Sequence, residues 1–177
     1  MVQTDDHELV QQCQAGQRTA QRQLFEQTSP RIYRLLLRMV GKPDDAADLT
    51  QETYVKGLER LSQFDGRSAV QTWFYRIAVN EALQFRRREK IGAAKLQNLA
   101  RTQSEAAPGT TSALRMDLDQ AMSQLSADDQ MILLLRYQEE LDYRRIAEIL
   151  ECVEGTVASR LNRARDRLRE MLRSGYE

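Results

Sequence analysis

Residues 141–172, LDYRRIAEILECVEGTVASRLNRARDRLREML, contain the pattern that decides the fold of this chain. Apolar residues at helical spacing predict a short helix over roughly 143–150, a tight turn at 151–153 and a second helix that opens at Glu154. The apolar stripe of the second helix can pack against Ile146, Ala147 and Leu150 of the first; it consists of Val157, Leu161, Ala164 and Leu168. The pattern predicts a helix-turn-helix.

The opposite face of the second helix combines small hydrogen-bonding residues near its start with arginine further along. This face consists of Gly155, Thr156, Ser159 and Arg163, with Arg160 and Arg167 at its edge. Such a surface suits insertion into the major groove of DNA, where side chains reach base edges and phosphates. The alternative is a surface helix with a solvated arginine face. We favour the DNA-binding interpretation.

Composition excludes several classes of protein. A chain of 177 residues can form one large domain or two small ones. It has no run of 18 uncharged apolar residues, and its acidic, polar start is not a secretory signal, so we expect a cytoplasmic protein. Cys13 and Cys152 match neither a disulfide framework nor a metal-ligand spacing, and His7 is the one histidine. We therefore expect no metal and no cofactor.

The net charge of zero hides a strong segregation of charge along the sequence. Residues 1–66 carry 8 basic and 10 acidic side chains, and residues 67–101 carry 8 and 2. Residues 102–151 carry 4 and 10, and residues 152–177 carry 6 and 4. The basic blocks can neutralise phosphates, whereas the acidic blocks would be repelled by DNA and are free to meet a basic protein. The pattern indicates two kinds of partner.

Almost the whole chain has helical periodicity, which predicts an all-α protein. The segment RTQSEAAPGTTSAL has no aromatic residue and cannot bury enough surface to order itself, so we expect a flexible linker at 96–114. The linker would separate two small helical domains, at 1–95 and 115–177. Pro30 lies inside a helical pattern, where we expect a kink or a restart of the helix.

The third predicted helix, about 44–61, has two different faces. Its core side consists of Ala46, Leu49, Thr50, Thr53, Gly57 and Leu61. Its other side is acidic and consists of Asp45, Asp48, Glu52 and Glu59, with Gln51 and Val55 beside them. Because an apolar residue lies next to the carboxylates, a protein-docking surface is about as good an explanation as a solvated face.

A loop at Phe64–Ala69 follows this helix and contains an arginine, and the segment 64–75 places four aromatic residues around it. Aromatic and guanidinium planes can hold an unstacked base, and glycine allows the backbone to approach it. Trp73 and Ile77 have the spacing of core residues, so we expect Phe64 and the loop to be the functional part. The helix after the loop ends in clustered arginine, which suits phosphates. We find no glycine-rich phosphate loop, nucleophile elbow or metal-ligand cluster, and we interpret the chain as a binding protein that is not an enzyme.

Three blocks together resemble an extracytoplasmic-function (group IV) sigma factor of the sigma-70 family. Residues 44–88 resemble region 2, residues 125–168 resemble region 4, and residues 8–40 are similar to the start of region 2. The resemblance rests on three motifs in the order of the family. They are Ala46-x-Asp48-Leu49-x-Gln51-Glu52, Thr72-Trp73-x-x-Arg76-Ile77-Ala78-x-Asn80 and Gly155-Thr156-Val157-x-Ser159-Arg160.

The resemblance implies a role in transcription initiation for each surface. The acidic face would bind the clamp of the largest subunit of core RNA polymerase through Asp45, Asp48, Gln51, Glu52 and Val55. The loop and the next helix would bind the −10 promoter element through Phe64, Gly66, Arg67, Ser68, Ala69, Asn80, Arg86, Arg87 and Arg88. The second helix of the helix-turn-helix would bind the −35 element through Thr156, Ser159, Arg160 and Arg163. The resemblance also implies an anti-sigma factor as a partner, and no small-molecule substrate.

The chain departs from the family in the turn of the helix-turn-helix. The family often has glycine where this chain has Glu151, and a left-handed conformation there costs another residue roughly 1 kcal/mol. We therefore expect the turn, and with it the fine placement of Thr156, to differ slightly from the family. Val153 also replaces a usual capping residue. Two other classes remain as alternatives. A stand-alone transcriptional regulator would sense a ligand or dimerise through its first domain, and a nucleic-acid enzyme would need a metal or nucleophile that we do not find.

Overall fold

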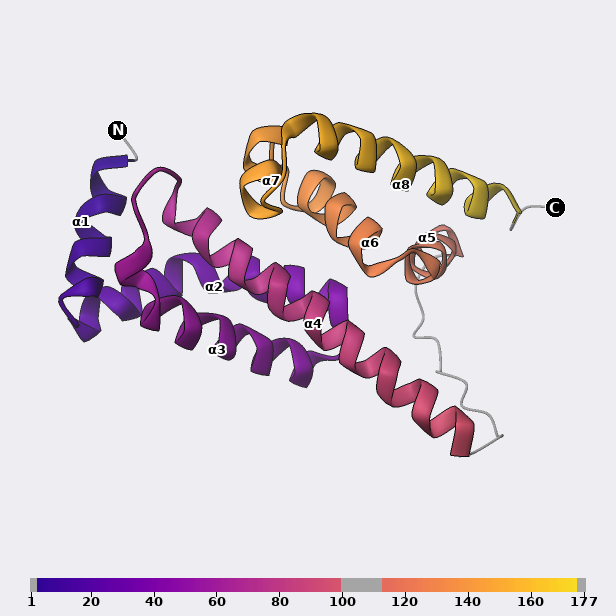
Figure 1. Cartoon of the computed structure of the whole chain (residues 1–177), viewed down its shortest axis with the longest axis horizontal. Helices are drawn as coiled ribbons and strands as arrows, with labels where there is room; N and C mark the ends of the chain where they lie inside the picture. The colour runs from indigo at the N-terminus through magenta and orange to yellow at the C-terminus, as the bar shows by residue number, and fades with distance from the viewer. Residues whose placement is uncertain (1–2, 100–112, 175–177) are drawn as a thin grey trace.

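Helices joined by short turns and loops make up the part of the chain that the structure describes, and this part contains no strand. The computed structural model describes residues 3–99 and 113–174. Figure 1 shows the order and arrangement of the helices. The elements are α1 (Gln3–Gln14), α2 (Arg18–Val40), α3 (Pro43–Glu59), the 3₁₀ turn η1 (Leu61–Gln63), α4 (Val70–Leu99), α5 (Ala113–Gln124), α6 (Ala127–Leu133), the π-helical turn η2 (Leu134–Gln138), α7 (Tyr143–Ile149) and α8 (Glu154–Ser174). The predicted all-α fold with two helical domains is confirmed.

Most of the predicted linker, 96–114, lies outside the described residues. Helix α4 continues to Leu99 and α5 begins at Ala113, so helix occupies both ends of the predicted segment. None of the helices in the described ranges combines the length and apolarity that crossing a bilayer requires.

Helices α2, α3 and α4 form the N-terminal core. Gly41 ends α2 in the left-handed region, at φ 77°, and Pro43 begins α3 two residues later. We expected a kink or a restart of the helix at Pro30; helix α2 passes through Pro30 as one helix, so there is no restart. Ile32 and Leu35 are fully buried directly after the proline. Their packing outweighs the cost of the missing backbone donor.

The predicted core side of α3 is buried and meets α4 at close range. Gly57 allows this approach, because a Cβ atom at residue 57 would lie 2.8 Å from Cδ1 of Phe74. The Phe74 ring stacks on Tyr54, with their centroids 4.7 Å apart. The register of α3 on α4 therefore depends on a glycine opposite an aromatic ring.

The C-terminal helices form the predicted helix-turn-helix. Ser126 caps α6 by accepting from the Asp129 N–H at 3.1 Å, and Asp142 caps α7 by accepting from the Arg145 N–H at 2.8 Å. Three members of the predicted stripe are buried against the core, namely Val157, Leu161 and Ala164, and Leu168 is half-buried. The sequence did not predict that α6 would pass into the π-helical turn η2.

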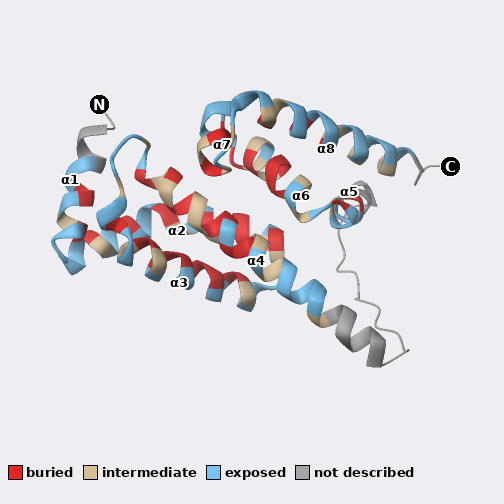
Figure 2. Cartoon of the chain, viewed as in Figure 1, coloured by how far each residue is buried: buried red, intermediate tan, exposed pale blue. Residues whose placement is uncertain are grey.

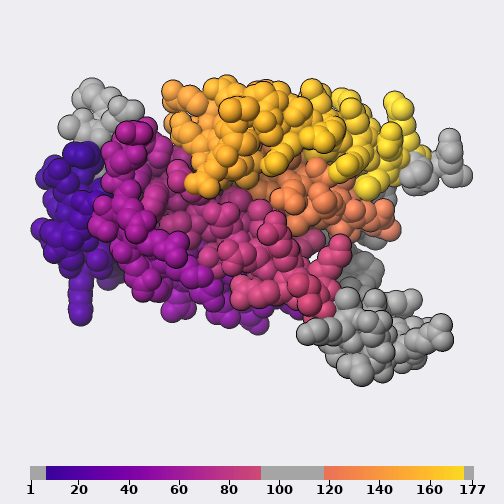
Figure 3. All heavy atoms as spheres, in the orientation of Figure 1, coloured from indigo at the N-terminus to yellow at the C-terminus, as the bar shows by residue number. Residues whose placement is uncertain are grey.

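The two halves of the chain pack against each other, which the sequence did not predict. Helices α6 and α7 lie beside α4, and the space-filling view shows the C-terminal half closed over it (Figures 1 and 3). The buried residues of both halves form one continuous cluster (Figure 2). Tyr75 of α4 donates a hydrogen bond to the carboxylate of Glu139, just after η2. Burial, together with this carboxylate, raises the pKa of Tyr75.

Candidate functional site

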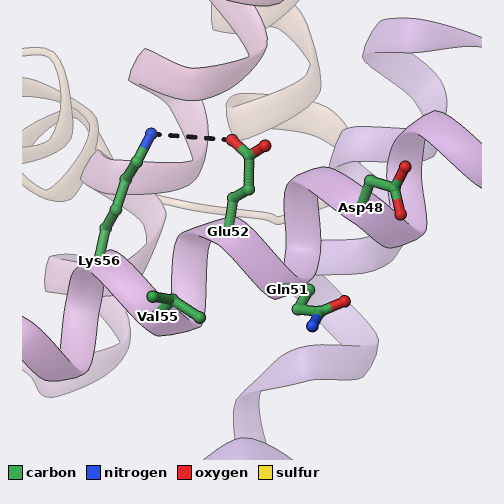
Figure 4. A pocket seen from close by; sticks show the side chains of 5 residues that line it. All are labelled: Asp48, Gln51, Glu52, Val55 and Lys56. Atoms are coloured by element: carbon green, nitrogen blue, oxygen red, sulfur yellow. Dashed lines mark ion pairs between the residues drawn. The ribbon is translucent and has the colours of Figure 1, made fainter.

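The exposed face of α3 forms a shallow hollow of about 300 Å³ (Figure 4). Its lining residues are Asp48, Gln51, Glu52, Val55 and Lys56. Four of these five belong to the predicted polymerase-binding set, and Val55 is 51% exposed between the polar groups. Two carboxylates, an amide and an exposed apolar side chain thus lie together on successive turns of one helix face. Such a surface suits a protein partner that offers basic and apolar groups.

Asp45, the remaining member of the predicted set, does not line this hollow. It lies in the first turn of α3, half-buried, with its carboxylate 3.9 Å from Nζ of Lys42. A carboxylate in this position also interacts favourably with the positive end of the helix dipole. The structure therefore gives Asp45 a role in the start of the helix.

Lys56 is a residue of this surface that the sequence analysis missed. Its Nζ atom lies 2.6 Å from Oε2 of Glu81, a buried carboxylate on α4, and 3.7 Å from Oε2 of Glu52. Because a buried carboxylate needs a donor, Glu81 holds the ammonium group in place, and the ammonium group in turn restrains Glu52. The i, i+4 spacing of Glu52 and Lys56 is a signal that could have identified the pair from the sequence.

The loop between η1 and α4 presents its tip to solvent. Asp65 Oδ1 accepts from the Arg67 N–H at 3.1 Å, and Gly66 between them adopts φ 73°. Arg67 and Ala69 are exposed, whereas Phe64 is half-buried and packs edge-to-face on Trp73 at 5.9 Å. The two residues predicted as core, Trp73 and Ile77, are both half-buried. Trp73 packs with Phe64 against the core, which places Phe64 at the base of the loop.

Helix α4 continues from the loop as a polar and basic surface. Asn80, Arg87 and Arg88 are exposed, as a DNA-binding role requires. Arg86 is different, because its guanidinium is half-buried and donates to the Met39 carbonyl and, at 3.3 Å, to Gln130 Oε1. In this conformation Arg86 is engaged within the protein, so not all of the predicted −10 residues are free to contact DNA.

Arg76 shares a stripe of α4 with Asn80, since residues four apart lie one above the other on a helix. It belongs to the second family motif but was not among the predicted DNA contacts. Its guanidinium lies over the Trp73 ring, 5.7 Å from the centroid, and Nη1 lies 3.1 Å from Oε1 of Glu151. Arg76 therefore joins the candidate −10 surface to the turn of the helix-turn-helix.

The predicted −35 residues lie in the first three turns of α8, and three of the four are exposed. Ser159, Arg160 and Arg163 are exposed and Thr156 is half-buried. Ser159 Oγ donates to the Thr156 carbonyl at 3.0 Å in this structure. The four side chains project from the helix end that a recognition helix presents to base edges.

The turn before α8 keeps a left-handed residue at position 151, although the sequence led us to expect a slightly different turn. Glu151 has φ 50°, in the left-handed region, and the Cys152 N–H donates to the Ala147 carbonyl at 3.0 Å. A residue with a Cβ atom is disfavoured there. The helix-turn-helix thus forms with a strained glutamate at the position where the family often has glycine.

Comparison with known proteins identifies both halves. Residues 24–91 match the family model Sigma-70 region 2, and residues 115–168 match Sigma-70, region 4. The chain is 30% identical to the RNA polymerase sigma-H factor of Pseudomonas aeruginosa, over 97% of this chain and 96% of that protein. It is 32% identical to the ECF RNA polymerase sigma-E factor of Haemophilus influenzae, over 93% of each chain.

Solved structures agree with these matches. The sigma factor RpoE of Bartonella quintana, solved in complex with the anti-sigma factor NepR, is 27% identical. It superposes with a TM-score of 0.67 over 86% of this chain and 96% of that one. CnrH, solved with the cytosolic domain of CnrY, has the same fold, with a TM-score of 0.70, 20% identity and coverage of 96% and 97%. The matched models, the motif order and the two helical domains lead to one conclusion: the chain belongs to the sigma-70 family of RNA polymerase sigma factors, in its extracytoplasmic-function group.

Proposed function

We propose that the exposed face of α3 binds the clamp of the largest subunit of core RNA polymerase, and that this contact recruits the chain to transcription initiation. The observation that carries the proposal is the hollow formed by Asp48, Gln51, Glu52 and Val55. It combines negative charge with an exposed apolar side chain and is restrained from α4 through Lys56. In this role the protein performs no chemistry and acts in the cytoplasm.

Promoter recognition is divided between the two domains in this proposal. The loop Phe64–Ala69, with Asn80, Arg86, Arg87 and Arg88, binds the −10 element, and Thr156, Ser159, Arg160 and Arg163 bind the −35 element. Binding energy from an extruded base in the loop offsets the cost of unstacking it, a few kcal/mol per base step. Arg67 and Gly66 support this role, because both are exposed at the loop tip.

Charge reversal on α3 tests the polymerase contact. Asp48→Lys and Glu52→Lys should abolish co-elution with core polymerase in gel filtration and leave the helical circular dichroism unchanged. Glu59→Lys is the matched control, since Glu59 is an exposed carboxylate on the same helix outside the hollow. Unchanged co-elution of the Asp48 and Glu52 variants would favour the stand-alone regulator instead.

We also propose that an anti-sigma factor regulates this protein. The supporting observation is that the RpoE structure, 27% identical over most of both chains, was solved with the anti-sigma factor NepR. Affinity purification of the chain from its native host should yield a partner that dissociates core polymerase from it. Recovery of core polymerase as the sole stoichiometric partner would contradict this proposal.

A further inference from the structure

A buried carboxylate on α4 contacts one of the residues that line the hollow of α3. Glu81 is 6% exposed, and its Oε2 atom lies 2.6 Å from Nζ of Lys56. A carboxylate that is removed from water needs a donor and a counter-charge, and Lys56 supplies both. The fold therefore places a negative charge of α4 next to the exposed surface of α3.

Lys56 is shared unequally between this carboxylate and that of Glu52. Its Nζ atom lies 3.7 Å from Oε2 of Glu52, the pair that Figure 4 marks, and 2.6 Å from Oε2 of Glu81. The shorter contact is a hydrogen bond, and the longer one exceeds hydrogen-bond range. Because the ammonium group is bonded to α4, Glu52 remains on the open side of the hollow, with its side chain 52% exposed.

The charge of the hollow depends on Glu81. Asp48 and Glu52 line the hollow as carboxylates, and the Lys56–Glu81 pair is neutral, so the group of four carries a net charge of −2. Without the charge of Glu81, the unpaired ammonium group would reduce it to −1. It would also move towards Glu52, because glutamate followed by lysine at i, i+4 is a favourable pair on a helix surface.

We propose that Glu81 is a positioning residue for the polymerase contact of α3. It holds Lys56 on α4 and thereby keeps the Glu52 carboxylate available for a basic group of the partner. This inference rests on the proposed function of the α3 face. Glu81 is buried and acts through Lys56, so it sets the charge of the binding surface without touching the partner.

A purely structural role of the same ion pair leads to a different expectation. The pair also ties α3 to α4, one residue away from the close contact between Gly57 and Phe74. If this tie were its whole purpose, removing both partners would loosen α3 at least as much as removing one. In the proposed role, removing both partners restores binding, because the ammonium group that neutralises Glu52 is removed as well.

The test measures the affinity of the labelled full-length chain for core polymerase by fluorescence anisotropy, without DNA. Glu81→Gln should weaken binding by roughly tenfold, which is the lower end of what a close charge pair across an interface contributes. Lys56→Gln/Glu81→Gln should bind nearly as well as the wild type, because neither a free ammonium group nor an unpaired buried carboxylate remains.

Glu59→Gln is the matched control for the loss of one negative charge. Glu59 is exposed on the same helix, outside the hollow, and its substitution changes the net charge of the chain as much as Glu81→Gln does. We expect Glu59→Gln to bind nearly as well as the wild type. The defect of Glu81→Gln should also become smaller at high salt, since salt screens partly exposed charges, whereas loosened helix packing would not recover.

Two outcomes would overturn the inference: unchanged binding by Glu81→Gln, or a double variant that stays as weak as Glu81→Gln. Circular dichroism checks that each variant is folded. If Glu81→Gln loses its helical signal, Glu81→Asp replaces it, since it keeps the charge but withdraws the carboxylate from Nζ of Lys56. Binding by Glu81→Asp should then fall by a smaller factor, and no fall would equally overturn the inference.

The variant Glu52→Lys, measured in the same titration, separates this inference from the proposed function. Wild-type affinity of Glu52→Lys would refute the polymerase contact itself. Weakened binding by Glu52→Lys together with unchanged binding by Glu81→Gln would refute only the role of Glu81.

Discussion

At the scale of single residues, Gly57 shows how one missing Cβ atom sets the distance between two helices. The variant Gly57→Ala should destabilise the protein by about 1–3 kcal/mol, because the added methyl group meets the buried Phe74 ring and overpacking outweighs the gain in helix propensity. Urea unfolding followed by circular dichroism measures the change. Gly92→Ala is the control, since nothing lies within 4 Å of a Cβ atom there. Equal stability of the two variants would contradict this account.

Tyr54 gives a second prediction at the residue scale, for alkaline pH. Burial raises the pKa of Tyr54 to about 12, although its hydrogen bond with Thr28 opposes the shift. The folded state therefore favours the neutral, protonated hydroxyl of Tyr54. The resulting contribution to stability is complete below pH 10 and is lost as the pH rises towards 12. We expect the unfolding free energy to fall in this window by up to about 1.4 kcal/mol per pH unit for this group. Tyr54→Phe should flatten the slope; an unchanged slope would refute the assignment.

At the scale of elements, each of the two turns that flank α7 contains a left-handed residue, and comparing the two separates backbone strain from the contact with α4. Glu140 has φ 54° and Glu151 has φ 50°, but only Glu151 of this pair contacts α4 through Arg76. Glycine at either position should relieve roughly 1 kcal/mol of backbone strain. Loss of the exposed ion pair costs at most about 1 kcal/mol, so the helix-turn-helix should not be weakened by Glu151→Gly.

Hydrogen exchange distinguishes these two variants. In Glu140→Gly the amides of α7, α8 and the α4 interface should all exchange as slowly as in the wild type or more slowly. In Glu151→Gly the amides of α7 and α8 should remain protected, while those of α4 beside Arg76 should exchange faster. Faster exchange throughout α7 and α8 in Glu151→Gly would show that the glutamate supports the turn itself.

At the scale of the whole molecule, the segregation of charge along the chain acts against binding of DNA by the free chain. The acidic blocks 1–66 and 102–151 repel duplex, whereas most of the residues that we propose to bind DNA lie in the basic blocks 67–101 and 152–177. We expect the isolated chain to bind promoter duplex weakly and the complex with core polymerase to bind it tightly and specifically. A band-shift assay at fixed salt measures both. Tight, specific duplex binding by the isolated wild type would contradict the charge argument.

Local patterns predicted much of this architecture, because they depend on contacts within one or two helices. The apolar stripe from Val157 to Leu168 predicted the packing of the helix-turn-helix. The left-handed conformation of Glu151 was not predicted, because a residue with a Cβ atom is disfavoured there. The two faces of α3 followed from helical periodicity alone. The roles of the site residues remain predictions, since the structure gives their exposure and neighbours and not their partners.

The sequence by itself determined the helices, the division into two domains and the family, since periodicity, caps and motifs are properties of neighbouring residues. Only the tertiary structure decided that Pro30 is carried inside one helix, that Lys56 bridges two carboxylates, and that Tyr75 meets Glu139. Each of these depends on atoms brought together from distant parts of the chain. The docking of the two domains is the largest such effect. Tyr75 and Glu139 are separated by 64 positions in the sequence, and Arg76 and Glu151 by 75, so no local pattern predicts these pairs.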